Sequence, residues 1–183
     1  MRTLRGVIGF ALGLGLWVAL TPGYNGLLSR AAQSTIRMFE SPDITTLRLK
    51  GREVLVFARD AGSRANRPGI PLYDLTFNVV LLTTLFASNR RWFETRNVVG
   101  FILSLLLLMS SHLFALIAYV QDVYASGLAG PRQVSPAARS LWSYAVYFYR
   151  LVGQFAIPLI LWWGFTPPAD RPTRSKRGLQ VAG

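Results

Sequence analysis

The chain has 183 residues, of which 51% are hydrophobic and only 15% are charged. Soluble domains carry about 25% charged residues, so this composition is typical of a small integral membrane protein. The absence of cysteine excludes disulfides, a thiolate nucleophile and cysteine-containing metal sites. The net charge of +12 is spread over loops and the C-terminal tail. It therefore favours contact with anionic lipid headgroups and argues against nucleic-acid binding.

Four apolar stretches are long enough to cross a bilayer, for which about 20 helical residues suffice. They define predicted spans at about 5–22, 71–88, 97–120 and 142–166 within a single domain, 1–166. We interpret the first span as a retained signal anchor, because the "TPGYNG" that follows has no small-residue cleavage site; the alternative is a cleaved signal peptide. The second span carries several polar residues, so it should face protein more than lipid.

Basic segments orient this bundle. "MRTLR", "NRRWFETR" and "DRPTRSKRG" are rich in Arg and Lys, which predicts that both termini and the link between spans two and three are cytoplasmic. The long first loop is also basic, but long loops translocate largely regardless of their charge. We expect a protein of the bacterial inner membrane with an extracytoplasmic first loop and a basic, disordered tail at 167–183.

The first outer loop, 23–70, has two predicted parts. Leu28, Ala32, Ile36 and Phe39 recur at helical spacing, which predicts an amphipathic helix that lies on the outer membrane surface or packs on the spans. Strand-favouring residues then flank "LKGR", where Gly51 can adopt the positive φ of a tight turn, so a β-hairpin is predicted at 44–58. The segment "AGSRANRPG" should be a flexible link, and the second outer loop should be irregular.

The predicted fold class is thus an all-α membrane protein with four transmembrane helices, an extracytoplasmic amphipathic helix and a small β-hairpin. At 1.5 Å per residue, Asn78, His112 and Arg150 lie about 10–12 Å below the outer ends of their spans. Polar side chains on three spans therefore share one level. We predict a polar intramembrane site composed of Asp74, Asn78, Ser111, His112, Arg150 and Gln154.

Two interpretations of this level stay open. Arg150 either snorkels outwards along its helix or pairs with Asp74 beside a polar pocket. His112 is either a neutral packing element between helices or a catalytic base. A metal site is not expected, since the chain has one histidine and no cysteine, and nothing predicts a cofactor.

The order of parts resembles the exosortase/archaeosortase family, with exosortase H as the nearest type. The matching features, over about residues 1–165, are a first span, the outer helix "YNGLLSRAAQSTIRMFE", the hairpin "ITTLRLKGREVLVF", a "PG" that enters the second span, an Arg-rich inner link and two further spans. The resemblance implies a membrane-embedded transpeptidase-like enzyme that processes C-terminal sorting signals (PEP-CTERM-like) with a cysteine, an arginine and a histidine at the outer face.

This chain departs from that pattern at the reactive group. In "RPGIPLYD", Pro68 and Gly69 are present, but Ile70 stands where the family's cysteine is expected. "MSSHLF" occupies the place of an Asn-x-x-Arg stretch, and "YAVYFYR" occupies the place of the family histidine. The resemblance therefore implies a cysteine-less relative or an exosortase H-associated membrane protein.

The main functional hypothesis is a non-catalytic accessory protein that binds an exosortase-like enzyme or an exported protein with a C-terminal sorting signal. Arg150 or Arg67 would meet a carboxylate of that partner. The alternative is a cysteine-independent membrane peptidase or transpeptidase-like enzyme with the catalytic candidates Asp74, His112 and Arg150. In that alternative Asp74 orients His112 as a general base, and Arg150 stabilises an oxyanion.

Overall fold

The structure is a computed structural model that describes residues 2–40, 45–58, 68–89, 91–127 and 134–166. The predictions for Arg67, the link 59–67 and the tail 167–183 fall outside these ranges. The helical segments are α1 (Arg2–Phe39), α2 (Leu72–Thr76), α3 (Asn78–Ala87), α4 (Thr95–Ala125), α5 (Pro136–Phe148), the π-helix η1 (Tyr149–Gly153) and α6 (Gln154–Phe165). The strands are β1 (Thr45–Lys50), β2 (Glu53–Ala58) and β3 (Gly69–Pro71).

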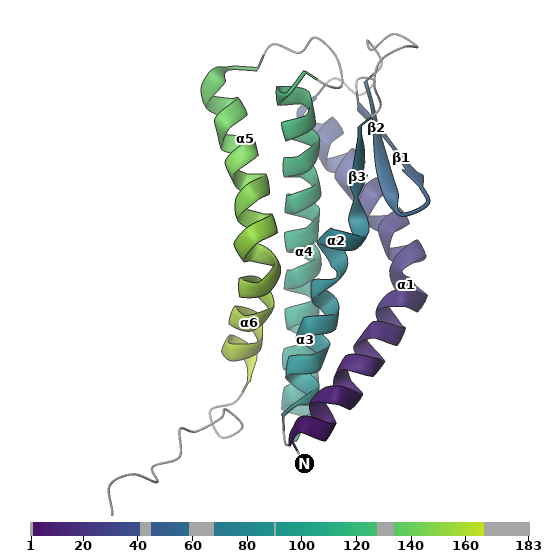
Figure 1. The fold of residues 1–183 in the computed structure, drawn as a ribbon, viewed down its shortest axis with the longest axis vertical. Helices are drawn as coiled ribbons and strands as arrows, with labels where there is room; N and C mark the ends of the chain where they lie inside the picture. The colour runs from purple at the N-terminus through teal and green to yellow at the C-terminus, as the bar shows by residue number, and fades with distance from the viewer. Residues whose placement is uncertain (1, 41–44, 59–67, 90, 128–133, 167–183) are drawn as a thin grey trace, which may run out of the picture.

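The helices form a bundle with a small sheet at one end (Figure 1). The end where α1 begins and α6 finishes is called the terminal end, and the opposite one the sheet end. From the terminal end, α1 and α4 each run to the sheet end, while α2–α3 and α5–α6 run back (Figure 1). The chain therefore passes along the bundle four times.

Three of the four helical passes are long and apolar enough to cross a membrane. They are Leu4–Phe39, Thr95–Ala125 and Pro136–Phe165. The remaining pass, Leu72–Ala87, is a shorter apolar helix; at 1.5 Å per residue it is about 24 Å long, less than the ~30 Å hydrocarbon core. The membrane character of the chain and three of its spans are thus supported, and the predicted second span is the short one.

The helix that contains the predicted first span does not end near residue 22. The 38-residue helix α1 continues through Pro22, so the expected outer helix is the second half of α1 and not a separate element. Proline removes one backbone donor, but polar side chains can satisfy nearby carbonyls in a membrane helix. The Thr21 hydroxyl donates to the Trp17 carbonyl one turn earlier. The helix changes direction along its length (Figure 1) and does not stop.

The second half of α1 packs beneath the sheet. Leu28, Ala32 and Ile36 are buried in one cluster with Val54 of β2, whereas Phe39 is 86% exposed. Of the two predicted placements, packing on other elements is the one observed for three of the four residues. Burial of this stripe contributes about 25 cal/mol for each Å² of apolar surface removed from water.

The predicted hairpin is confirmed. β1 and β2 pair antiparallel from Thr45 opposite Ala58 to Lys50 opposite Glu53, and Gly51 has a φ of 63° in the turn. A third strand was not predicted: β3 pairs antiparallel with β2 and sets Ile70 opposite Val54. Because β3 has three residues, it carries too little alternation to be seen in the sequence.

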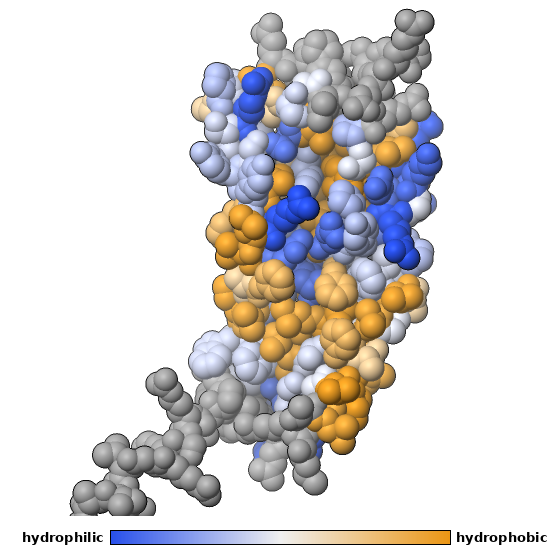
Figure 2. Space-filling model, viewed as in Figure 1, coloured by the Kyte–Doolittle hydropathy of each residue, from blue (hydrophilic) through white to orange (hydrophobic). Residues whose placement is uncertain are grey.

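Hydrophobic side chains on the visible face lie mainly toward the terminal end, and hydrophilic ones lie mainly toward the sheet end (Figure 2). The hydrophilic surface also extends into the middle of this face (Figure 2). At 1.5 Å per residue the 31-residue α4 is about 46 Å long, which exceeds the ~30 Å hydrocarbon core. If α4 crosses the apolar layer, its last turns at the sheet end therefore extend beyond that layer and lie at the level of the sheet.

Candidate functional site at the centre of the bundle

The site begins at a break in the short second pass. α2 ends at Thr76 and α3 begins at Asn78, with a turn at Phe77 between them. Such a break exposes backbone groups that water cannot satisfy within a membrane, so protein side chains must bond to them. The Tyr149 hydroxyl donates to the Leu75 carbonyl at 3.3 Å, and Gln154 Nε2 donates to the Asp74 carbonyl at 2.9 Å.

Both donors come from the π-helix region of the last pass. η1 spans Tyr149–Gly153, and Gln154 follows it at the start of α6. A π-turn fits an additional residue into a helical turn and re-aims the side chains around it, and such turns are frequent at functional sites. The broken second pass and the π-helix are thus complementary, since one leaves carbonyls open and the other supplies donors.

A chain of hydrogen bonds then connects all four passes, with His112 joining three of them directly. The Tyr24 hydroxyl of α1 lies 2.7 Å from His112 Nδ1, and His112 Nε2 lies 2.7 Å from Asn78 Oδ1 on α3. Asn78 Nδ2 donates to the Tyr149 hydroxyl at 3.4 Å. We call Tyr24, His112, Asn78 and Tyr149 the central polar cluster.

One assignment of hydrogens satisfies the whole cluster without any charge. The Asn78 oxygen accepts from His112 Nε2–H, so His112 is a neutral imidazole whose Nδ1 accepts from the Tyr24 hydroxyl. Asn78 Nδ2 donates to the Tyr149 oxygen, and the Tyr149 hydrogen goes to the Leu75 carbonyl. Each donor in this series has an acceptor, which removes the large cost of an unsatisfied polar group in an apolar interior.

Three members of the cluster are buried, whereas Tyr24 is half-buried and lines an apolar cavity of ≈190 Å³ between α1, α2–α3 and α4. His112 is 0% exposed, Asn78 5% and Tyr149 8%. Ser111, next to His112, lies within hydrogen-bond reach of the Tyr149 hydroxyl and also donates to the Leu108 carbonyl at 2.7 Å. The imidazole of His112 therefore has no exposed surface in this arrangement.

The charged candidates lie apart from the cluster. Arg150 is exposed and Asp74 is half-buried; no ion pair joins these two described residues, and Asp74 makes no hydrogen bond to His112. Both lie within electrostatic range of Tyr119 on α4, as does Asp122. Asp122 Oδ1 in turn accepts from the Ser143 hydroxyl of α5 at 2.5 Å.

These residues come from three neighbouring helical segments. We call Asp74, Tyr119, Asp122 and Arg150 the lateral polar surface. It lies where α2, α4 and η1 approach one another, and hydrophilic residues extend toward the middle of the molecule on the face drawn in Figure 2. Of the two interpretations of Arg150, the ion pair with Asp74 is not formed, and the guanidinium is exposed beside the carboxylates of Asp74 and Asp122.

The predicted polar site is therefore two groups. Asn78, Ser111 and His112 come together as expected, whereas Gln154 bonds the backbone carbonyl of Asp74. Sequence reasoning missed Tyr24 and Tyr149. Tyr24 lies beyond the predicted end of the first span, and Tyr149 belongs to an aromatic run that resembles an interfacial belt. Tyr149 and Gln154 are five residues apart, which is not α-helical spacing, so the sequence carried no signal that linked them.

Two further findings bear on chemistry. Ile70, at the position that the resemblance gives to a cysteine, is 2% exposed and belongs to the hydrophobic cluster beneath the sheet. Within the described ranges, no three His, Asp or Glu side chains gather as metal ligands would. The site as built offers hydrogen bonds, one exposed guanidinium and two carboxylates.

Comparisons with known proteins find no counterpart: no family model, no curated protein and no solved structure matches the chain.

Proposed function

We propose that this chain is a non-catalytic, four-span protein of the bacterial inner membrane that assists an exosortase-like protein-sorting system. It binds either the sorting enzyme or an exported protein that bears a C-terminal sorting signal. Both termini face the cytoplasm, and the sheet end faces outwards. The contact surface is the lateral polar surface together with the lipid-facing side of α5–α6.

The observation that carries the proposal is the full burial of His112, with both of its ring nitrogens hydrogen-bonded. A general base needs a free lone pair within reach of the proton that it removes. Both nitrogens of His112 are engaged, at 2.7 Å each, and the ring is fully buried. This geometry favours a structural role, in which His112 fixes three helices relative to one another, over the peptidase alternative.

The buried Ile70 supports the same conclusion. An accessory protein that descends from an enzyme scaffold can replace the nucleophile by a core residue, because no reaction selects for a thiol there. Ile70 sits opposite Val54 in the sheet and contributes to packing. Fully burying such a side chain stabilises the fold by about 1.5–3 kcal/mol.

The binding part of the proposal depends on Arg150. Its guanidinium is exposed on a helix whose neighbouring residues Leu151 (71% exposed) and Phe148 (64% exposed) are apolar. A partner's transmembrane segment can pack on these apolar side chains while its terminal carboxylate or an acidic residue accepts hydrogen bonds from Arg150. Charge-assisted hydrogen bonds to Arg are about twice as strong as neutral ones.

The test is quantitative pull-down of the tagged full-length chain from its native membranes in mild detergent, read by mass spectrometry. The wild type should enrich a cysteine-bearing exosortase-like enzyme or a protein with a C-terminal sorting signal. Arg150→Ala should reduce that recovery about tenfold, as expected when a charge-assisted contact of about 1.5–3 kcal/mol is lost.

Arg139→Ala is the matched control, because Arg139 is also exposed and lies on α5 in the same pass. It should recover the partner as the wild type does. Equal recovery with Arg150→Ala and Arg139→Ala would contradict the role of Arg150. Recovery of neither partner class by the wild type would contradict the sorting function itself.

A further inference from the structure

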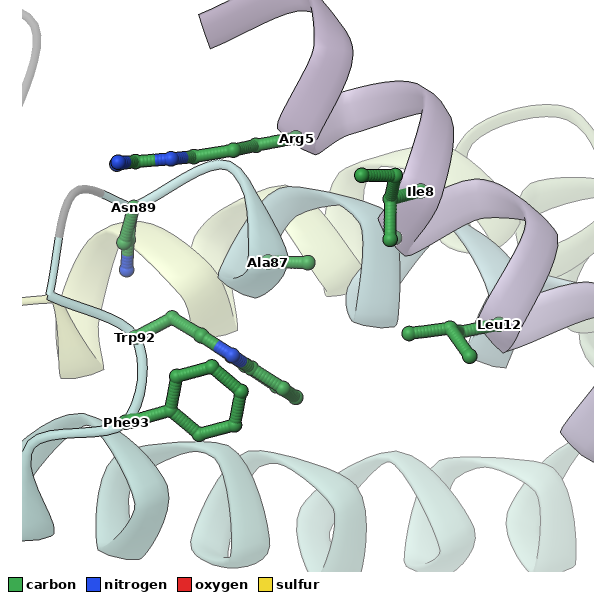
Figure 3. Close-up of a pocket in the computed structure, with 8 residues that line it drawn as sticks. Arg5, Ile8, Leu12, Ala87, Asn89, Trp92 and Phe93 are labelled. Carbon is green, nitrogen blue, oxygen red and sulfur yellow. The ribbon is translucent and has the colours of Figure 1, made fainter. Parts of the chain in front are cut away.

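A cavity of ≈290 Å³ lies at the terminal end, away from both polar groups described above. It is bounded by the start of α1, the end of α3 and the link to α4 (Figure 3). The lining residues are Arg5, Ile8, Gly9, Leu12, Ala87, Asn89, Trp92 and Phe93. We call it the terminal-end cavity.

The cavity has two chemically different parts. Arg5 extends over Asn89 at one side, whereas the rings of Trp92 and Phe93 lie across from Ile8 and Leu12 (Figure 3). The second part is an open apolar groove, because Ile8, Leu12 and Phe93 are 49%, 59% and 83% exposed. A ligand with one anionic group and a long apolar part matches both.

The cavity also has the position of a lipid site. Arg5 is at the start of the membrane-compatible stretch Leu4–Phe39, and Leu12 is seven residues further along the same helix. At 1.5 Å per residue these two side chains are about 10 Å apart along the axis, which is the step from the headgroup layer into the acyl chains. Trp92 fits this boundary as well, since tryptophan is enriched at membrane interfaces.

The local charge selects the headgroup. Among the residues described near this end, the cations Arg5, Arg91 and Arg96 outnumber the one carboxylate, Glu94, which pairs with Arg91 at 3.4 Å. Basic pockets between membrane helices on the cytoplasmic side bind anionic headgroups. Asn89 serves to hold the site in place, because it donates to Thr166 at 3.4 Å and accepts from Trp162 at 3.2 Å.

We propose that the terminal-end cavity binds one anionic phospholipid, with its phosphate at Arg5 and an acyl chain between Trp92, Ile8 and Leu12. This site is independent of the proposed sorting function and of the lateral polar surface. The bound lipid contacts both the start of α1 and the link between α3 and α4, because residues of both line the cavity.

The experiment measures tryptophan fluorescence of the full chain in phosphatidylcholine nanodiscs that contain a small fraction of lipid brominated on its acyl chains. Bromine quenches a nearby indole, and subtraction of a Trp92→Phe variant isolates the Trp92 signal from those of the other four tryptophans. Brominated phosphatidylglycerol should quench this signal at about fivefold lower mole fraction than brominated phosphatidylcholine.

Two variants locate the effect. Arg5→Gln should abolish the preference for phosphatidylglycerol, whereas Arg96→Gln should keep it, because Arg96 is exposed at the same end but does not line the cavity. Equal quenching by the two brominated lipids in the wild type would overturn the proposal without reference to any variant. Equal loss of preference in both variants would show attraction to a general surface charge and would overturn the site as well.

Discussion

The hydroxyl of Tyr24 lies 2.7 Å from Nδ1 of His112, although 88 residues separate them in the chain. Their rings meet edge to face with centroids 5.8 Å apart. This contact joins α1 to α4 just beyond Pro22, so it requires that α1 continue through the proline. The same imidazole holds α3 through Asn78, which makes His112 a junction of three passes.

The first prediction concerns the energy of this junction. Replacing His112 by Leu leaves Tyr24 and Asn78 without their partner, so the free energy of unfolding should fall by about 1–3 kcal/mol. Reversible unfolding of the purified protein in mixed micelles measures the change. Ser110→Ala is the control. Ser110 is exposed on the same helix, and its hydroxyl donates to the backbone carbonyl of Leu106 within that helix.

A double-mutant cycle sharpens this test. Tyr24→Phe and His112→Leu, alone and together, should give a coupling of about 0.6–1.7 kcal/mol, the range measured for hydrogen bonds between membrane helices. Additive effects would mean that the 2.7 Å contact contributes nothing to stability, and they would weaken the structural role assigned to His112.

The second prediction concerns the broken pass. Tyr149→Phe removes the hydroxyl that bonds the Leu75 carbonyl and accepts from Asn78. Stability should fall by about 1–2 kcal/mol, and backbone amides around Phe77 should exchange hydrogen faster. Tyr147→Phe, two residues earlier and 62% exposed, is the matched control and should leave both quantities unchanged. Identical exchange in the two variants would exclude the proposed support of the break.

The third prediction concerns close packing between α1 and α3. A methyl group at Gly9 would overlap the side chain of Ala87, and one at Gly13 would lie 3.0 Å from Thr83, whereas nothing lies within 4 Å of Gly15. Gly9→Ala and Gly13→Ala should therefore each cost about 1–3 kcal/mol. Gly15→Ala should be neutral or stabilise the helix by up to about 1 kcal/mol. Stabilisation by all three would show that the helices are not in contact.

Patterns that repeat within one element were readable from the sequence. Hydropathy located three long membrane-compatible helices, and the strand pattern around Gly51 located the hairpin with its positive φ. The stripe Leu28–Ala32–Ile36 predicted a helix face that either lies on the membrane surface or packs on other elements. The second interpretation is the one observed. Each of these signals comes from residues that are close in the chain.

Features that depend on two distant elements were not readable. Hydropathy bounded the predicted first span at residue 22, where the apolar stretch stops, and it does not reveal that the helix continues through Pro22 to pack beneath the sheet. The break at Phe77 and the π-helix each require the other, so neither leaves a local signal. For the site, Asn78, Ser111 and His112 were identified by depth, but their aromatic partners resembled lipid-facing residues.

The fourth prediction concerns topology and uses the natural absence of cysteine, which makes single-cysteine variants clean reporters. Lys50→Cys lies in the hairpin, Arg96→Cys at the start of α4 and Ile102→Cys on the apolar surface of α4. In intact spheroplasts, an impermeant maleimide should label Lys50→Cys only. Arg96→Cys should react after permeabilisation, and Ile102→Cys should resist labelling in both conditions because hydrocarbon covers it.

This pattern would require the chain to cross the membrane between residues 50 and 96, and α2–α3 is the only described helical segment available for that crossing. At about 24 Å the segment is shorter than the hydrocarbon core, so the bilayer must thin locally or the protein must supply the remaining polar support. The hydrogen bonds from Tyr149 and Gln154 to the start of this pass are that support. Labelling of Lys50→Cys and Arg96→Cys from the same side would instead leave α2–α3 as a re-entrant segment and reduce the bundle to three spans.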